Sequence, residues 1–375
     1  MRQTITNWVL LIVLMLGHAY ARPRWSSEQA NTWYGKQPWL VGSNFIPSNS
    51  INELEMWQAE TFDLKRIDQE LGWAESIGMN TMRVFLHDLP WQSDPEGYAR
   101  RIDQFLSVAS KHGIRPMFVL FDSCWDPNPK TGMQHPPVPG VHNSGWVQSP
   151  GAAALKDSNQ YPRLKAYVQG VIGKFGSDPR VLAWDVWNEP SNRNESSYGN
   201  QELKDKERYA EVLLPQVFEW ARAANPIQPL TSGVWDIHYD QDQHTVIQRT
   251  QLDESDVISF HNYGWPEEFR AEVVALQKLG RPIICTEYMA RGAGSTFDTV
   301  LPIASELHVA AINWGFVAGK TQTFLPWDSW EHPYVLRPPP IWFHEVLRED
   351  GSPYRRAEVD LIRSLTSKAN GRRDR

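Results

Sequence analysis

The chain has 375 residues and a formal net charge of −7 at pH 7. This length suffices for a large hydrophobic core, and the mildly acidic balance gives no electrostatic attraction to nucleic acid or to an anionic membrane. We therefore expect no nucleic-acid partner, and the sequence does not reveal the oligomeric state.

The first 21 residues have the pattern of a secretory signal peptide. Arg2 precedes an apolar run at residues 8–16, and Ala19-Tyr20-Ala21 offers a cleavage site. Because the run is shorter than the roughly 20 residues of a membrane-spanning helix, cleavage after Ala21 is favoured over a membrane anchor. We expect a secreted or periplasmic protein with no membrane association after cleavage.

Strand-like and helix-like segments alternate through the remainder. Short apolar runs predict strands at residues 39–45, 81–86, 115–121, 181–187, 229–235, 257–261, 283–287 and 310–316. Apolar residues at helical spacing predict helices at residues 62–77, 98–109, 164–175, 209–224, 244–252, 269–279, 300–307 and 357–365. Eight such pairs predict one α/β domain, a (β/α)8 barrel over residues 22–367, followed by a basic tail at residues 368–375. An open doubly wound sheet is the alternative, but its Gly-rich turn after the first strand is absent.

Two predicted loops are long. Residues 123–161 follow the third strand and residues 321–340 follow the eighth. Both would lie at the C-terminal face of the barrel, where barrel enzymes keep their sites. Long ordered loops are usually functional, so we expect both to shape a binding site.

A glutamate closes each of two predicted strands. The fourth strand runs into Asn188-Glu189-Pro190, and the seventh ends at Thr286-Glu287. In a barrel these two ends lie across the same mouth, so the carboxyls should converge. Such a pair cleaves a glycosidic bond when one carboxyl protonates the leaving oxygen and the other attacks the sugar or activates water. A separation of about 5 Å implies retention of anomeric configuration, and a wider gap implies inversion.

Tryptophan is abundant, with 18 residues. Its large flat ring with one polar edge suits the stacking of sugars, although most tryptophans serve the core. Those near predicted strand ends are the candidates for a sugar site, namely Trp125, Trp187, Trp235, Trp265, Trp314 and Trp327.

In these motifs the chain resembles the glycoside hydrolases of clan A, closest to family 5, from the first strand to the eighth. The matching features are Asn-Glu-Pro after strand four, a glutamate ending strand seven, His-x-Tyr after strand six and a tryptophan at strand eight. The resemblance implies that Glu189 is the acid/base and that Glu287 is the nucleophile of a retaining mechanism. It places Arg83 beside the nucleophile.

The resemblance implies further supporting residues. Tyr263 would donate a hydrogen bond to the nucleophile, His261 would lie near the acid/base, Asn188 would bind the sugar 2-hydroxyl and Trp314 would form the floor under the ring. Each could instead be an ordinary core or strand-end residue.

A second group of candidates would bind substrate, namely Asp122, His87, Trp125, Trp327 and Asp328. Wall packing is the alternative for His87 and Asp122. The chain departs from the family at strand three, where many members have a histidine and this chain has Asp122. That departure leaves the preferred sugar open.

Other chemistries lack their motifs. The sequence contains no H-E-x-x-H motif, no cysteine cluster and no Gly-x-Ser-x-Gly elbow, so neither a metal nor another cofactor is expected. Cys124 and Cys285 both fall near predicted strand ends. They would form either a disulfide or two separate buried thiols.

The sequence thus predicts a secreted retaining glycoside hydrolase that cleaves β-linked glycosides in plant or microbial oligo- or polysaccharides. The two long loops would favour exo action by closing one end of the cleft. An endo-acting β-glucanase, mannanase or xylanase is the alternative, and a non-catalytic carbohydrate-binding barrel is a further one. Sugar, linkage and the choice between pyranoside and furanoside stay open.

Overall fold

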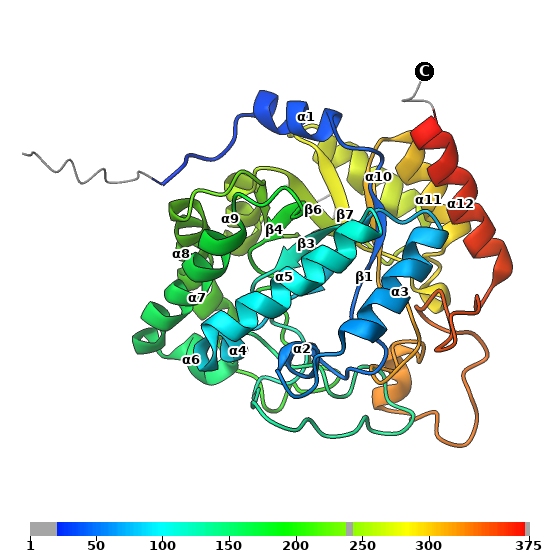
Figure 1. Ribbon diagram of the computed structural model, residues 1–375, viewed down its shortest axis with the longest axis horizontal. Helices are drawn as coiled ribbons and strands as arrows, with labels where there is room; N and C mark the ends of the chain where they lie inside the picture. Colours follow the sequence, from blue (N-terminus) through cyan, green and yellow to red (C-terminus); the bar gives the residue numbers. More distant parts are fainter. Residues whose placement is uncertain (1–20, 238–242, 372–375) are drawn as a thin grey trace, which may run out of the picture.

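Eight parallel strands form the centre of the fold (Figure 1). The computed structural model describes residues 21–237 and 243–371, so nearly all of the predicted signal peptide lies outside the described residues. All eight predicted strands are present: β1 (Val41–Asn44), β2 (Thr81–Phe85), β3 (Arg115–Val119), β4 (Ala183–Asp185), β5 (Leu230–Thr231), β6 (Ile258–His261), β7 (Ile283–Glu287) and β8 (Ala310–Asn313).

The sheet closes into a barrel. Hydrogen-bonded neighbours follow the order β5-β4-β3-β2-β1-β8-β7-β6. Val234, just after β5, completes the ring by a parallel bridge to Phe260 of β6, in which the Val234 amide donates to the Ser259 carbonyl at 3.0 Å. The predicted (β/α)8 barrel is confirmed, and the doubly wound alternative is wrong.

Helices surround the strands. The eight predicted helices appear as α3 (Leu64–Ser76), α5 (Pro95–Lys111), α7 (Tyr161–Phe175), α8 (Lys206–Ala223), α9 (Val246–Glu254), α10 (Pro266–Gln277), α11 (Phe297–Glu306) and α12 (Arg356–Gly371). Helix α12 continues past residue 368, where the tail was predicted to begin. No helix among the described residues is long and apolar enough to cross a membrane.

Several short elements were not predicted. They are α1 (Ser27–Gly35), α2 (Glu53–Trp57), α4 (Asp88–Ser93), α6 (Ala152–Lys156) and the 3-10 turns Ser158–Gln160, Arg291–Ala293 and Trp327–Trp330. Apart from α1, each has six residues or fewer, which is too short to show a helical period.

Helix α1 covers the N-terminal end of the barrel. Trp25 and Ala30 pack there against Met117, Leu182 and Ile312 at the strand beginnings. Figure 1 shows α1 at the opposite end of the molecule from the loops 123–161 and 321–340. The open mouth is therefore the C-terminal face, where β4 and β7 end.

The two long loops bind each other over that face. The Asn143 amide donates to the Thr321 carbonyl at 2.8 Å, and the His142 amide donates to Ser329 Oγ at 2.9 Å. Trp125 stacks on Trp330 with ring centroids 5.7 Å apart and an angle of 16°. The loops therefore form one continuous wall, which we call the loop wall (residues 123–161 and 321–340).

Candidate active site

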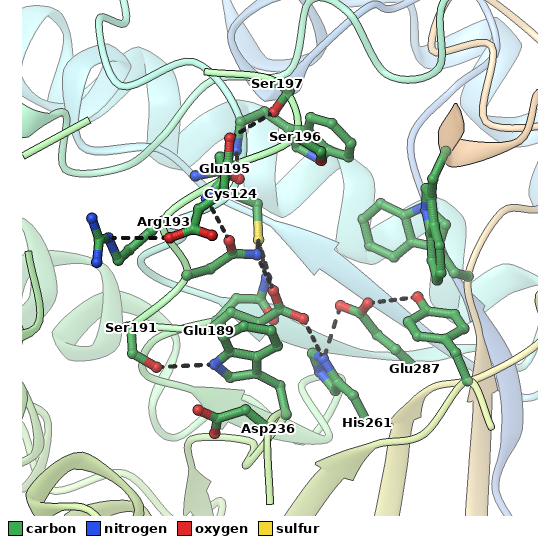
Figure 2. A pocket seen from close by; sticks show the side chains of 18 of the residues that line it. Cys124, Glu189, Ser191, Arg193, Glu195, Ser196, Ser197, Asp236, His261 and Glu287 are labelled. Carbon is green, nitrogen blue, oxygen red and sulfur yellow. Dashed lines mark hydrogen bonds and ion pairs between the residues drawn. The ribbon is translucent and has the colours of Figure 1, made fainter. Parts of the chain in front are cut away.

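Glu189 and Glu287 lie together at the mouth of the barrel (Figure 2). Both are buried, with exposed fractions of 8% and 5%, and both line a cavity of about 730 Å³. One oxygen of each carboxyl and one ring nitrogen of His261 lie within 4.8 Å of one another. The predicted convergence of the two strand ends is therefore present.

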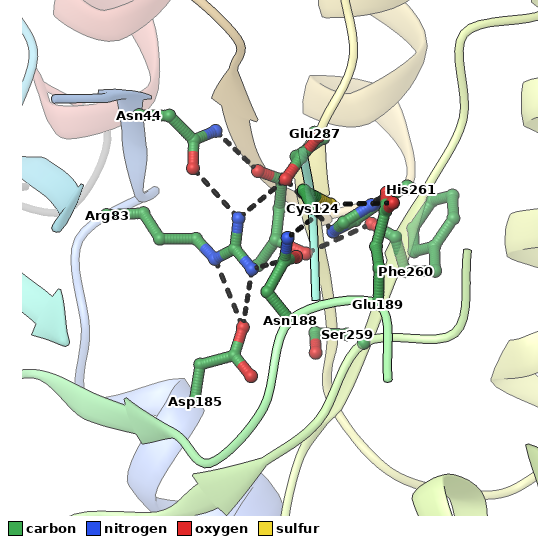
Figure 3. Close-up of polar contacts among 12 residues, drawn as sticks. Asn44, Arg83, Cys124, Asp185, Asn188, Glu189, Ser259, Phe260, His261 and Glu287 are labelled. Atoms are coloured by element: carbon green, nitrogen blue, oxygen red, sulfur yellow. Dashed lines mark hydrogen bonds and ion pairs between the residues drawn. The ribbon is translucent and has the colours of Figure 1, made fainter. Parts of the chain in front are cut away.

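Glu287 accepts hydrogen bonds from a guanidinium (Figure 3) and from a hydroxyl. Arg83 Nη1 donates to Glu287 Oε1 at 2.8 Å, and the Tyr263 hydroxyl donates to Glu287 Oε2 at 2.8 Å. Arg83 is itself fixed by Asp185 Oδ2 at 2.8 Å and by Asn188 Oδ1 at 2.7 Å. This arrangement stabilises the charged form of Glu287 and limits its rotation.

Among the described residues, no lysine or arginine bonds Glu189, and its ion-pair partner is the imidazole of His261. Its Oε1 lies 2.7 Å from His261 Nδ1, and its Oε2 accepts from the Asn192 amide at 2.7 Å and from the Cys124 thiol at 3.2 Å. The backbone of Glu189 has φ 44°, a left-handed conformation that is strained for this residue type. The chain turns at this residue, directly before Pro190, and the Glu189 side chain lines the cavity.

Burial is the largest influence on these groups. It raises the pKa of Glu189 and of Glu287 above the usual glutamate value, and Arg83 opposes that rise. Burial also lowers the pKa of His261 to about 4, so its imidazole is neutral near pH 7. Of the two glutamates, only Glu287 is bonded by Arg83, so the surroundings favour ionisation of Glu287 over ionisation of Glu189.

We expect kcat/KM to follow a bell-shaped dependence on pH. In the roles that the family resemblance implies, Glu189 acts in its protonated form. Its raised pKa keeps the proton to higher pH, and activity would decline as pH rises through that value. Glu287 would act in its ionised form, so activity would also decline as pH falls through the pKa of that group. Rates from about pH 3 to 10 with an activated aryl glycoside would measure both limbs. An alkaline limb that persists in Glu189→Gln would contradict this assignment.

The structure brings most predicted site residues to the cavity. Lining residues that the sequence singled out are Asn188, Glu189, His261, Tyr263, Glu287, Trp125, Trp235, Trp314 and Trp327. Trp187 is instead fully buried, so a sugar-stacking role for it is wrong. Trp265 is exposed and lies outside the cavity lining.

Three of the five candidates for substrate binding in the second group do not line the cavity. Asp122 is buried behind it and accepts from Trp146 Nε1 at 2.7 Å and from Asn188 Nδ2 at 2.9 Å. His87 is fully buried and accepts from the Leu89 amide at the start of α4. Asp328 is exposed and accepts from the Tyr334 hydroxyl at 3.1 Å. Asp122 and His87 therefore pack in the wall, as the alternative interpretation stated. The sequence shows that both residues follow a strand, but it does not show whether their side chains point into the cavity.

Sequence reasoning missed other lining residues. Cys124 is a free thiol beside Glu189, and Cys285 is a free, buried thiol, so the disulfide alternative is wrong. Asn192, three residues after Glu189, donates a hydrogen bond from its side-chain amide to Glu189 Oε2. His142 lies inside the long loop after β3. The polar run after Pro190 was a usable signal for Asn192, whereas the sequence around His142 contains none.

The same cluster offers ligands for a metal ion. Among the described residues, Glu189, His261 and Glu287 form the one group with suitable spacing. Arg83 already places a positive charge 2.8 Å from Glu287 Oε1, and a cation bound there would be repelled. The donor set therefore suits a proton-sharing carboxyl pair better than a metal.

No family model matches the chain, and no curated protein does. Solved structures match over most of its length. GH5_18 from Streptomyces cattleya, in complex with Manb1-4GlcNAc, has 14% identity and a TM-score of 0.61 over 88% of this chain and 81% of that one. The endo-1,4-beta-mannanase from Rhizomucor miehei has 16% identity and a TM-score of 0.59 over 91% of this chain and 96% of that one.

A third match is the exo-beta-1,4-mannosidase from Opitutaceae bacterium strain TAV5. It has 17% identity and a TM-score of 0.60 over 94% of this chain and 62% of that one. The structural neighbours thus include GH5_18 enzymes, in keeping with the resemblance to family 5, together with a mannanase and a mannosidase. At these identities the likeness shows a shared fold.

Proposed function

We propose that this protein is a retaining β-glycosidase that works through Glu189 and Glu287. The observation that carries the proposal is the separation of at most 4.8 Å between an oxygen of each carboxyl. Retaining enzymes keep their carboxyls about 5–5.5 Å apart, whereas inverting enzymes need about 6.5–9.5 Å to admit a water molecule.

The surroundings of the two carboxyls assign their roles. Ionised Glu287, oriented by Arg83 and Tyr263, attacks the anomeric carbon and forms a glycosyl ester. Protonated Glu189 gives its proton to the departing oxygen and then takes one from the water that cleaves the ester. Asn188 Nδ2 donates to Asp122 Oδ1 at 2.9 Å and makes a longer hydrogen bond to Cys124 Sγ at 3.5 Å. The sugar 2-hydroxyl would take the place of the thiol as the second acceptor.

Covalent trapping tests this proposal. Intact-protein mass would be measured after incubation with 2-deoxy-2-fluoro glycosyl fluorides, beginning with the β-mannosyl and β-glucosyl reagents because the solved neighbours include mannosidases, mannanases and a beta-glucosidase. We expect one added glycosyl unit that maps to Glu287 and is absent in Glu287→Ala. A folded protein that hydrolyses a matching aryl glycoside without any label would overturn the retaining mechanism. A non-catalytic barrel would show neither label nor turnover.

The shape of the cavity supports exo action. Beyond Trp314, the loop wall meets the ends of β1 and β2, and the space left among Phe85, Asn143 and Trp146 is about 20 Å³. That space holds roughly one water molecule and no second sugar. On the other side the cavity reaches the exposed residues Arg193 and Glu195. One terminal sugar therefore fits at the closed side, and the remainder of the substrate extends toward solvent.

We expect a β-linked oligosaccharide labelled at its reducing end to lose one sugar at a time. Free monosaccharide should appear from the first time point, the label should stay on the shortened chain, and the viscosity of a polymer should change little. Chromatography of early products measures this. A rapid fall in viscosity with internal fragments would favour the endo-acting β-glucanase, mannanase or xylanase alternative.

Secretion is also part of the proposal. The folded domain starts directly after the predicted cleavage site, since Arg22 Nη2 bonds Asp256 Oδ2 at 2.6 Å and the Trp25 amide bonds Asp256 Oδ1 at 2.7 Å. Cleavage after Ala21 would release a chain whose first residues are already anchored. The mass of the exported protein tests this, and we expect a chain that begins at Arg22.

A further inference from the structure

A histidine that the catalytic steps do not use lies at the closed end of the cavity, which we define by Trp125, His142 and Trp314. His142 belongs to the loop wall and is only 1% exposed, yet it lines the cavity. Its ring lies 5.4 Å from that of Trp125. It is therefore placed beside a terminal sugar that sits over Trp314.

The tautomer of His142 is fixed by one hydrogen bond. Its Nδ1 lies 2.7 Å from the Leu325 carbonyl oxygen. A carbonyl only accepts, so Nδ1 carries the hydrogen and Nε2 of the neutral ring presents a lone pair. Within the described residues Nε2 bonds to no protein group, and it is not among the unpartnered atoms sealed from solvent. Nε2 is thus the polar atom that His142 offers to the cavity.

A neighbouring histidine provides a contrast. His344 lies 5.4 Å from His142, ring to ring, and its Nδ1 also bonds a carbonyl, that of Met289, at 2.6 Å. Its Nε2 is sealed and unpartnered, and the residue does not line the cavity. The two rings share one tautomer, but only His142 can meet a substrate.

His142 stays neutral and fixed under working conditions. Burial lowers its pKa to about 4, so the ring does not gain a second proton near pH 7. Its backbone amide is tied to Ser329 Oγ, on the partner segment of the loop wall. Nε2 is therefore a permanent acceptor at a defined position.

We propose that His142 is a specificity-determining residue of the glycone subsite. Its Nε2 accepts a hydrogen bond from a hydroxyl of the terminal sugar that lies away from the anomeric carbon, on C3, C4 or C6. The enzyme thereby selects sugars that carry this hydroxyl, and the lack of a lysine or arginine among the described residues of the closed end leads it to reject uronic acids. This inference rests on the proposed glycosidase function.

The charge around the closed end agrees with a neutral sugar. Where that hydroxyl is the one on C6, the carboxylate of a uronic acid would face the Nε2 lone pair and gain no hydrogen bond. Of the described residues that line the cavity, Arg193 alone is a lysine or arginine, and it lies in the exposed run after Glu189, beside Glu195 at 3.9 Å. A buried anion at the closed end would lack a partner, which is costly.

The test combines substrate and protein changes. Aryl glycosides of the accepted sugar, with the same leaving group and with the 3-, 4- or 6-hydroxyl removed in turn, would be compared in the wild type, His142→Phe and His344→Phe. We expect one deoxy substrate to lose about 10- to 100-fold in kcat/KM in the wild type, because a buried acceptor is then unpaired. That loss should disappear in His142→Phe and persist in His344→Phe. The corresponding uronide should not be cleaved.

Ratios between proteins cancel the intrinsic reactivity of each deoxy sugar. If His142 only packs the wall, His142→Phe would slow all substrates by the same factor, and this result would overturn the inference. The inference would also be overturned if the wild type cleaved all three deoxy substrates with equal kcat/KM. This second comparison uses the wild type alone and does not depend on the folding of a variant. In both cases labelling of Glu287 would remain, so the glycosidase proposal would stand. If the wild type neither became labelled at Glu287 nor hydrolysed any aryl glycoside, both the glycosidase proposal and this inference would be overturned.

Discussion

Replacing Glu287 with alanine is expected to lower kcat by more than about 10⁴-fold, because the variant has no group to form the glycosyl ester. The fold should persist, since Arg83 retains its contacts to Asp185, Asn188 and Asn44. Steady-state rates with an aryl glycoside and circular dichroism of the same sample measure both effects. Rates within tenfold of wild type would contradict the assigned nucleophile.

Azide distinguishes the two glutamates. In Glu287→Ala the small anion can occupy the vacated space and attack a β-glycoside from the opposite face, so the product should be the α-glycosyl azide. In Glu189→Ala, an activated leaving group still allows the ester to form on Glu287, and azide should then give the β-glycosyl azide. Product stereochemistry by NMR decides the roles, and the reverse pattern would exchange them.

Arg83→Met should have the largest effect on stability. Arg83 and Asp185 are fully buried, and Arg83 bonds both Asp185 and Glu287. Removing the guanidinium leaves buried carboxylates without their cation, at a cost of about 3–5 kcal/mol in the free energy of unfolding. Activity should fall as well, because Glu287 loses the group that keeps it ionised.

The matched control for Arg83 is an exposed pair. Lys111 bonds Asp68 at 2.9 Å, with 63% and 39% of the two side chains exposed. Lys111→Met should therefore change the free energy of unfolding by less than about 1 kcal/mol. Denaturant unfolding of both variants at pH 7 gives the comparison. Equal decreases in the free energy of unfolding of the two variants would show that the buried Arg83 cluster stabilises the fold no more than the exposed Lys111–Asp68 pair does.

The barrel and the carboxyl pair were predictable because both depend on local patterns. Continuous apolar runs mark strands that are covered on both faces, and the glutamates at residues 189 and 287 terminate two such runs. Once the strands are ordered, the fold itself brings these ends together. The position of Arg83 beside Glu287 was implied by the family resemblance alone; Arg83 lies in β2, and its long side chain reaches Glu287.

The loop-borne part of the site was not predictable in this way. His142 owes its position to Leu325 and Ser329, more than 180 positions away in sequence. Neither part of the loop wall has a periodic pattern of apolar residues from which this contact could be predicted. Asp122 and Trp125 are three residues apart, yet one is sealed behind Asn188 and the other lines the cavity. Such differences arise from backbone turns, including the left-handed Trp125 at φ 69°.

In the proposed retaining mechanism, the closed end of the cavity also has a consequence for what becomes of the glycosyl ester. Because the loop wall covers the far side, the departing group and the molecule that attacks the ester use the same opening, next to Glu189. After the first group leaves, an alcohol or a second sugar can take its place and be deprotonated by Glu189, as water is. The enzyme should then transfer its sugar to added acceptors, building new β-glycosides at high acceptor concentration.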